Sequence, residues 1–213
     1  MRRKVSYLRY IDLSHTIVDQ LPGYPGDGCV QLIQQPSASD SRFRNQVLTI
    51  GMHMGTHLDA PGHMLFPGPA VAELPLQATC GRTWLFDCRD QNPIILTAEQ
   101  CAPLAAGDKV LLWTGWDRHF GEDDYFTGFP LVSEETARRL VDSGVSMVGM
   151  DTPSPDRQPY EVHRILFAAG VLIAENLTGL GQLQGHNPFE LLVLPLKVKA
   201  DGGPARVVAR LPE

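Results

Sequence analysis

The sequence predicts one mixed α/β domain, and three observations support this fold class. Apolar runs at residues 83–88, 109–114, 145–150 and 171–174 have the length and composition of buried strands. Segments with helix start and stop signals lie between several of these runs. A chain of 213 residues can bury one substantial core, whereas two complete domains would be cramped, so residues 1–213 are expected to form a single domain.

The first third of the chain is expected to supply strands and one long turn. Residues 7–18, 29–35 and 42–50 have strand-like patterns, and the last of them leads into a histidine-rich segment. Residues 21–28 contain two prolines and three glycines, which indicates a loop. The apolar, proline-rich residues 64–69 form either a stiff loop or the wall of a pocket.

Three helices and a β-hairpin are predicted in the remainder. The first helix begins at Thr97 with a capping-box pattern and ends at Gly107. The second follows Ser133, a favoured N-cap, and runs to about residue 143. The third covers residues 161–169. Strand-like segments at residues 189–199 and 205–211 are joined by a turn at Asp201-Gly202-Gly203, which indicates a hairpin.

Composition and charge exclude several classes of function. The formal charge of −6, from 18 basic and 24 acidic side chains, gives no electrostatic footprint for nucleic acid. No apolar run is long enough for a membrane span, and no apolar segment follows the basic residues 2–4, so a signal peptide is not predicted. The four cysteines form no C-x-x-C pair and are expected to be reduced thiols. We therefore expect a cytoplasmic protein.

Residues 53–63, HMGTHLDAPGH, hold three of the seven histidines and one carboxylate. A helix would place Asp59 about 240° around the axis from His53, and two glycines and a proline also oppose it. In an extended segment, by contrast, His53, His57, Asp59 and His63 occupy odd positions and project from one side. The four groups are then able to converge.

Imidazole and carboxylate groups without a nearby thiolate are typical ligands of zinc, manganese or iron. Met54 is the one sulfur in the segment, and its position directs it to the opposite side. An isolated histidine is more often a surface or hydrogen-bonded residue, but four such groups on one side favour a metal or catalytic site. Glu175 directly follows an apolar strand, where a buried carboxylate requires a partner.

The chain resembles the metal-dependent cyclase family that includes bacterial kynurenine formamidase and isatin hydrolase. The family signature H-x-G-T-H-x-D-x-P-x-H is matched at every fixed position of residues 53–63. Further matches are Tyr24-Pro25-Gly26-Asp27, Thr114-Gly115-Trp116, Gly149-Met150-Asp151-Thr152-Pro153-Ser154, His163 and Glu175-Asn176-Leu177. Together these matches extend over most of the chain.

The resemblance implies a swivelling β/β/α fold, a divalent metal site and a homo-oligomer, either a dimer or a tetramer. Zn²⁺, as one or two ions, is the expected metal, and Mn²⁺ is the alternative. His53, His57 and Asp59 are then ligands of the first ion. Asp59 bridges to a second ion that His163 and Glu175 hold.

The resemblance also gives His63 and Glu175 as the catalytic residues and a small molecule as the partner. A divalent ion lowers the pKa of bound water to about 7, so hydroxide becomes available, and His63 can take or give a proton. Tyr24 and Phe66 are expected to face the substrate, because the family pattern places both of their loops near the metal.

Several other residues have two open interpretations. Trp113, Trp116 and Phe120 either line an aromatic pocket or pack in the core. Asp151 and Ser154 either line the site or satisfy their own turn. Thr56 either orients a metal ligand or satisfies the local backbone.

The expected function is hydrolysis of an amide bond, with an aryl formamide such as N-formylkynurenine, a metabolite of tryptophan catabolism, as the first candidate substrate. Hydrolysis of a cyclic amide of the isatin type, or a lyase or cyclase reaction, would use the same metal. A metal-binding protein without turnover is the remaining alternative. His63 opposes it, because a structural site gains nothing from an extra imidazole.

Overall fold

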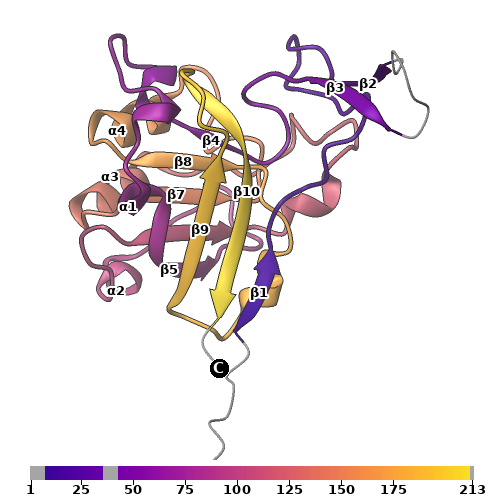
Figure 1. Cartoon of the computed structure of the whole chain (residues 1–213). Helices are drawn as coiled ribbons and strands as arrows, with labels where there is room; N and C mark the ends of the chain where they lie inside the picture. The colour runs from indigo at the N-terminus through magenta and orange to yellow at the C-terminus, as the bar shows by residue number, and fades with distance from the viewer. Residues whose placement is uncertain (1–7, 36–42, 212–213) are drawn as a thin grey trace, which may run out of the picture.

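A mixed β-sheet that closes on itself forms the centre of the fold (Figure 1). The structure is a computed structural model that describes residues 8–35 and 43–211. The strands are β1 (Arg9–Asp12), β2 (Gln31–Gln35), β3 (Asn45–Thr49), β4 (His57–Asp59), β5 (Cys80–Asp87), β6 (Lys109–Trp113), β7 (Met147–Met150), β8 (Leu172–Glu175), β9 (Phe189–Pro195) and β10 (Gly202–Leu211). Because β9 also pairs with β10, seven strands close in the order β10-β4-β8-β7-β6-β5-β9, and β1 pairs with β10.

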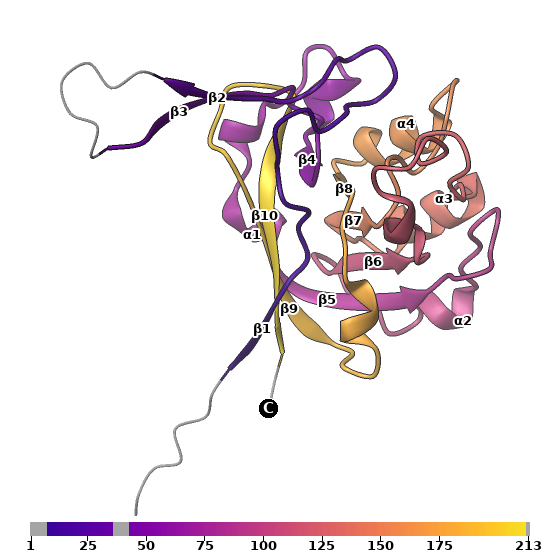
Figure 2. The same ribbon diagram turned by 90° about the vertical axis from the view of Figure 1, so that its right-hand side faces the viewer.

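Strands β5 to β8 run parallel and carry the helices on their outer face. The α-helices are α1 (Leu76–Thr79), α2 (Ala98–Cys101), α3 (Glu134–Asp142) and α4 (Glu161–Ala168), and the 3₁₀ helices are η1 (Pro61–His63), η2 (Val71–Glu73), η3 (Trp116–His119) and η4 (Leu180–Leu183). Figure 2 shows α2, α3 and α4 on the side of the parallel strands. This arrangement confirms the predicted mixed α/β fold class.

The parallel strands are apolar on both faces because each face is buried against a different partner. Val110 and Leu112 of β6 belong to the cluster that includes Leu140 and Leu166 of the outer helices. Leu111, between them, belongs to a second cluster inside the barrel with residues of β9 and β10. The continuous apolar runs of the sequence therefore follow from this two-layer arrangement.

Several predicted elements are shorter than expected. The helix predicted from Thr97 to Gly107 begins with the expected capping box, but α2 ends at Cys101. Pro103 follows two residues later and has no N–H to donate to Glu99, so the helix cannot continue. The strand predicted at residues 7–18 is reduced to β1, after which an isolated bridge joins Ser14 to Leu177. Residues 2–4, 7 and 42 of the sequence predictions lie outside the described residues.

The C-terminal hairpin is confirmed, but its turn is longer than predicted. Antiparallel pairing of β9 with β10 ends at the pair Pro195 and Ala205, so β9 does not extend to residue 199. Residues 202–204 pair instead with residues 57–59 of β4. The start of β10 therefore lies directly beside the histidine-rich segment.

The described helices are short. The longest, α3, has nine residues between its N-cap Ser133 and its C-cap Ser143. Within residues 8–35 and 43–211, none has the length and apolar character that a bilayer span requires.

Candidate metal centre

Strands β4 and β8 bring His57 and Glu175 opposite each other, because the two residues are register partners in this antiparallel pair. His57 Nε2 lies 3.3 Å from Glu175 Oε2 and 3.3 Å from Oδ1 of Asp59, two residues along β4. His53 reaches the same carboxylate from the turn before β4, with Nδ1 2.6 Å from Asp59 Oδ1. His57, Asp59 and Glu175 are buried.

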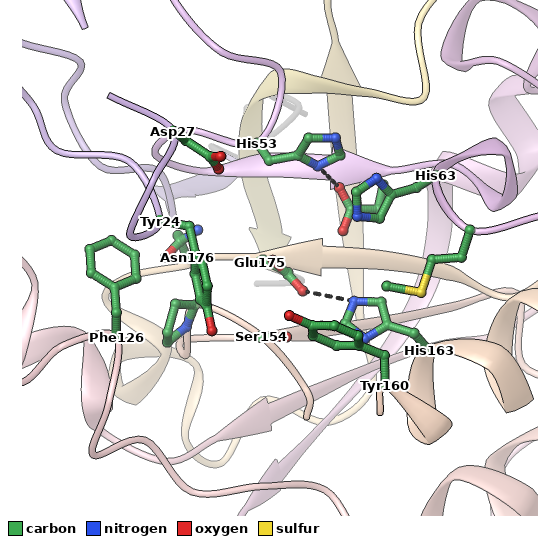
Figure 3. A pocket seen from close by; sticks show the side chains of 13 residues that line it. Tyr24, Asp27, His53, His63, Phe126, Ser154, Tyr160, His163, Glu175 and Asn176 are labelled. Atoms are coloured by element: carbon green, nitrogen blue, oxygen red, sulfur yellow. Dashed lines mark hydrogen bonds and ion pairs between the residues drawn. The ribbon is translucent and has the colours of Figure 1, made fainter. Parts of the chain in front are cut away.

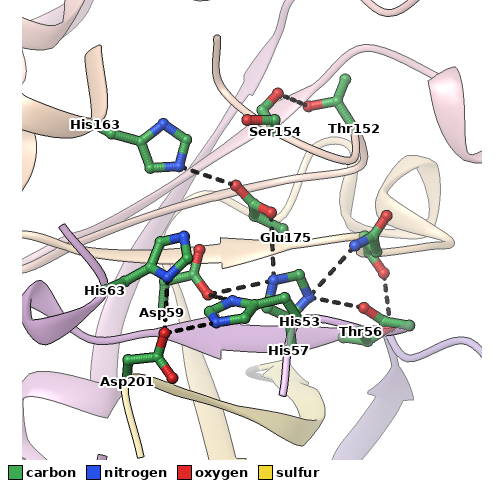
Figure 4. Close-up of polar contacts among 12 residues, drawn as sticks. His53, Thr56, His57, Asp59, His63, Thr152, Ser154, His163, Glu175 and Asp201 are labelled. Carbon is green, nitrogen blue, oxygen red and sulfur yellow. Dashed lines mark hydrogen bonds and ion pairs between the residues drawn. The ribbon is translucent and has the colours of Figure 1, made fainter. Parts of the chain in front are cut away.

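Helix α4 adds a third imidazole to this cluster. His163 Nε2 lies 3.5 Å from Glu175 Oε1, and the imidazole is buried (Figure 4). Ligand atoms of His53, His57 and Asp59 lie within 4.8 Å of one another, as do those of Asp59, His163 and Glu175. The structure therefore brings together all five residues predicted as ligands, with Asp59 common to both groups.

Two buried polar atoms of the cluster fit a cation-binding role. His57 Nε2 and Glu175 Oε1 have no hydrogen-bond partner among the described residues. An unpaired buried polar atom is costly, and such atoms are rare in folded proteins. A divalent ion would bind both atoms. The set of imidazole and carboxylate donors without thiolate fits zinc, manganese or iron, as the sequence predicted.

Hydrogen bonds to residues around the cluster orient the rings of His57 and His163, so that one nitrogen of each ring faces the centre of the cluster. The carbonyl of Gly55 lies 2.8 Å from His57 Nδ1, and since a carbonyl can only accept, Nδ1 carries the proton. His163 Nδ1 likewise donates to Asp156 Oδ1 at 2.6 Å. The Asp156 carboxylate is itself held by the backbone N–H of Val162 at 2.6 Å. In both histidines Nε2 is therefore the atom left for a metal.

The electrostatics of the cluster also suit a cation. Burial tends to lower the pKa of His163, but the neighbouring carboxylates of Asp156 and Glu175 outweigh it and raise the pKa to about 10. Burial tends to raise the pKa of Asp59, but the charge of His57 and the hydrogen bond from His53 hold it below its usual value. Without metal, protonated imidazoles thus balance the buried carboxylates, and a divalent ion supplies the same positive charge.

The path of the chain through residues 53–63 differs from the extended segment that the sequence predicts. Only His57 and Asp59 share a strand, whereas His53 lies in the preceding turn and His63 ends η1. Gly55 has a φ of 64°, and Pro61 begins η1, so neither flank is extended. The predicted convergence is present, but a turn, a strand and a 3₁₀ helix produce it.

A cavity of about 240 Å³ opens onto the cluster (Figure 3). Its floor contains the predicted ligands His53, Asp59, His163 and Glu175, and His63 lies at its edge. Aromatic side chains form much of the remaining wall. The other lining residues are Tyr24, Asp27, Met64, Phe126, Pro153, Ser154, Tyr160 and Asn176.

Comparisons with known proteins agree with this geometry. The model of the Cyclase family matches residues 11–157. The chain belongs to the Cyclase family. Kynurenine formamidase from Maricaulis maris is 31% identical over 205 residues, which cover 93% of this chain and 96% of that protein. Kynurenine formamidase from Bacillus cereus is 29% identical over 206 residues, covering 94% of this chain and 97% of that protein.

Two solved structures have the same overall fold as this chain. Isatin hydrolase A from Labrenzia aggregata, bound to benzyl benzoate, superimposes with a TM-score of 0.81 at 26% identity and covers 97% of this chain and 94% of its own. A second structure, of a potential metal-dependent hydrolase with cyclase activity, has a TM-score of 0.77 at 28% identity and covers 97% of this chain and 100% of its own. The predictions of the family, of a divalent metal site and of a metal-dependent amide hydrolase are confirmed.

The aromatic residues of this Cyclase member are distributed differently from the prediction. Tyr24 lines the cavity, but the prediction for Phe66 is wrong, because its side chain is fully exposed and Met64 forms the wall at this point. Trp113 packs against the barrel cluster, Trp116 donates to the Tyr125 carbonyl, and Phe120 stacks on His15. Phe126 and Tyr160, which no sequence pattern identified, take the place of these residues in the wall.

The structure also distinguishes the two interpretations that the sequence left open for Ser154, Asp151 and Thr56. Ser154 lines the cavity. Asp151 is buried and accepts hydrogen bonds from Thr114 and Gly115, so it braces the turn after β6. Thr56 donates to the Asn176 carbonyl at 2.6 Å and thereby fixes the backbone beside His57.

The cluster predicts that divalent metal stabilises the fold. A chelator should lower the Tm, and added Zn²⁺ or Mn²⁺ should restore it, because a ligand present at about 100 times its Kd adds about 2.7 kcal/mol.

Asp59→Ala should lose most of the bound metal, measured by mass spectrometry of the purified protein. His186→Ala, outside the cluster, is the control. An equal metal content in Asp59→Ala and wild type would contradict the assignment.

Proposed function

We propose that this amide hydrolase acts on an aryl formamide such as N-formylkynurenine. The observation that carries the proposal is the position of the ligand cluster at the floor of a cavity with aromatic walls, with His63 beside it. The similarity to kynurenine formamidases over more than nine-tenths of the chain supports the same substrate class.

The walls suit an aryl group next to the reacting amide. Tyr24 and Phe126 meet edge to face, with ring centroids 5.6 Å apart, and Tyr160 contacts His163 in the same manner at 5.8 Å. An aromatic substrate ring packed against such side chains gains about 0.5–1.5 kcal/mol per pair beyond the burial of its area. The formamide group then lies over the floor of the cavity.

His63 is the proposed acid–base group. Its Nδ1 lies 2.9 Å from the Asp201 carboxylate, which leaves Nε2 to exchange protons in the cavity. When bound, the divalent ion provides Lewis acidity toward water and the amide oxygen. Nε2 takes the proton from the attacking water and passes it to the departing aryl amine. Glu175 contributes to catalysis as a ligand, because its two oxygens face His57 and His163.

We propose Zn²⁺ as the metal, with Mn²⁺ as the alternative and two ions as the full complement. The support for two ions is that Asp59 belongs to both ligand groups. A carboxylate shared in this way can neutralise part of the charge of two neighbouring cations. Three imidazoles and two carboxylates match the nitrogen and oxygen donors that zinc accepts in catalytic sites.

The charged residues that line the cavity limit the kinds of substrate that can bind there. None of its thirteen lining residues is lysine or arginine, and Asp27 is the one carboxylate of the lining that lies outside the cluster. Asp27 offers a partner for an ammonium group such as that of N-formylkynurenine, whereas the carboxylate of the same substrate has no lysine or arginine partner among the lining residues. Uncharged aryl formamides should therefore also be accepted. Isatin, a neutral cyclic amide, is the second candidate, favoured by the similarity to isatin hydrolase A.

Turnover of N-formylkynurenine, formanilide and isatin by the metal-loaded protein tests the proposal. His63→Ala should retain metal and lower kcat on the preferred substrate by about 10²–10⁴, the usual contribution of a positioned acid–base group. His119→Ala, which lies outside the cavity, should behave as wild type. Faster opening of isatin than of either formamide would replace the formamidase assignment by the second candidate. Unchanged kcat in His63→Ala would remove this residue from the mechanism.

We also propose that the protein is a cytoplasmic homo-oligomer. The hairpin of β2 and β3 projects from the barrel in both views (Figures 1 and 2), and Ile33, Val47 and Leu48 on it are 42–49% exposed. An isolated two-stranded hairpin is only marginally stable in water, so a second copy of the chain is its proposed cover.

The four free cysteines support the cytoplasm as location.

Light scattering coupled to size exclusion should give a dimer or tetramer for the full chain. Replacing Val47 with lysine on the hairpin should shift the mass toward the monomer, because a charge would be buried at the contact. Lysine in place of Leu76, an exposed residue of α1, is the matched control. A monomeric wild type would overturn the proposal.

A further inference from the structure

The side chain of Asp201, which is not among the predicted ligands, contacts two histidines of the site. Its Oδ2 lies 2.9 Å from His63 Nδ1 and 3.1 Å from His53 Nε2 (Figure 4). The sequence predicts Asp201 only as part of a hairpin turn. The structure thus adds a carboxylate that contacts both the proposed acid–base residue and a proposed ligand.

The fold holds this turn firmly against the histidines. The Asp201 carbonyl accepts from the N–H of Ala60 at 2.9 Å, and the next residues of the chain pair with β4. Gly202 lies so close to the His53 ring that an added Cβ would be 2.5 Å from its Cε1. A glycine is therefore required at 202 for the ring to lie against the turn.

The two contacts of Asp201 involve different ring nitrogens. In the metal-free protein both nitrogens of His53 face carboxylate oxygens, Nδ1 at Asp59 and Nε2 at Asp201, and both therefore donate; if a metal took Nδ1, the proton on Nε2 would remain on Asp201. His63 directs Nδ1 at the same carboxylate oxygen, so its proton belongs on Nδ1 and Nε2 is left free. A single oxygen thus accepts from one ring at Nε2 and from the other at Nδ1.

We propose that Asp201 is a positioning residue that holds His63 in the Nδ1–H tautomer with Nε2 available to the cavity. The proposal rests on the proposed function of His63 as the acid–base group. Without the Asp201 carboxylate, the imidazole loses its fixed acceptor, and the wrong tautomer places a proton where a base is needed. Asp201 itself contacts neither the proposed substrate position nor the reacting atoms, and it acts through the ring.

The first test is independent of turnover. Long-range ¹H–¹⁵N NMR spectra of the metal-free protein report which ring nitrogen carries the proton, and the His63→Ala spectrum assigns the signals. Wild type should show His63 as the Nδ1–H tautomer, and Asp201→Ala should show a mixture or the Nε2–H form. The same Nδ1–H tautomer in Asp201→Ala would overturn the proposal, whatever substrate the enzyme uses.

The second test uses kinetics at saturating metal. Asp201→Ala should lower kcat by about 10–100-fold with little change in KM, whereas Asp201→Asn, which keeps an acceptor oxygen, should recover part of the loss. In a His63→Ala background, Asp201→Ala should cause no further loss, because both changes remove the same function. Asp123→Ala, an exposed loop variant, is the control.

Three outcomes distinguish the alternatives. Additive losses in the double variant would show that Asp201 acts apart from His63 and would contradict the proposal. His53, His63 and Asp201 are also close enough to hold an ion themselves, so loss of one metal equivalent in Asp201→Ala would make Asp201 a ligand instead. If no amide is hydrolysed but the tautomer depends on Asp201, the proposed function fails while the positioning contact stands.

Discussion

The burial of Asp59 and Glu175 among imidazoles is the constraint on which the site depends. Two carboxylates removed from water require positive charge close by, and His53, His57 and His163 supply it within 2.6–3.5 Å. A divalent ion would meet the same requirement, and it would give a partner to His57 Nε2 and Glu175 Oε1, which have none among the described residues. The same arrangement therefore stabilises the metal-free fold and selects a cation.

Strand pairing sets the geometry of this cluster. The antiparallel pairing of β4 with β8 fixes His57 opposite Glu175, and the pairing of β10 with β4 places Asp201 at the outer side of His53. A shift of β4 by one residue would turn Leu58 toward the cluster and both ligands toward the barrel core. Leu58 is fully buried in that core, so hydrophobic packing enforces the register that metal binding needs.

Sequence patterns predicted the features that depend on neighbouring residues, but they missed the contacts that form only when the chain folds. The capping signal at Ser133 and the ligand motif at residues 53–63 each lie within a few residues, so they could be recognised. Asp156 and Asp201 are hydrogen-bond partners of ligands only because the fold brings them there, from 7 and 148 residues away. Phe66 was misassigned for the same reason, since the direction of a loop side chain depends on tertiary contacts.

The ligands and the cavity wall are held by different parts of the structure. Most of the ligands lie on strands and on α4, whose positions the core determines, whereas Tyr24, Phe126 and Ser154 lie on separate loops. Loop residues can change without disturbing the register of β4 and β8, because they contribute little to the buried clusters. Formamidases and an isatin hydrolase are both among the relatives of this chain, so the same fold is found with different amide substrates. On physical grounds the loop residues of the wall, rather than the proposed ligands, are the part of the site that can vary without disturbing the core.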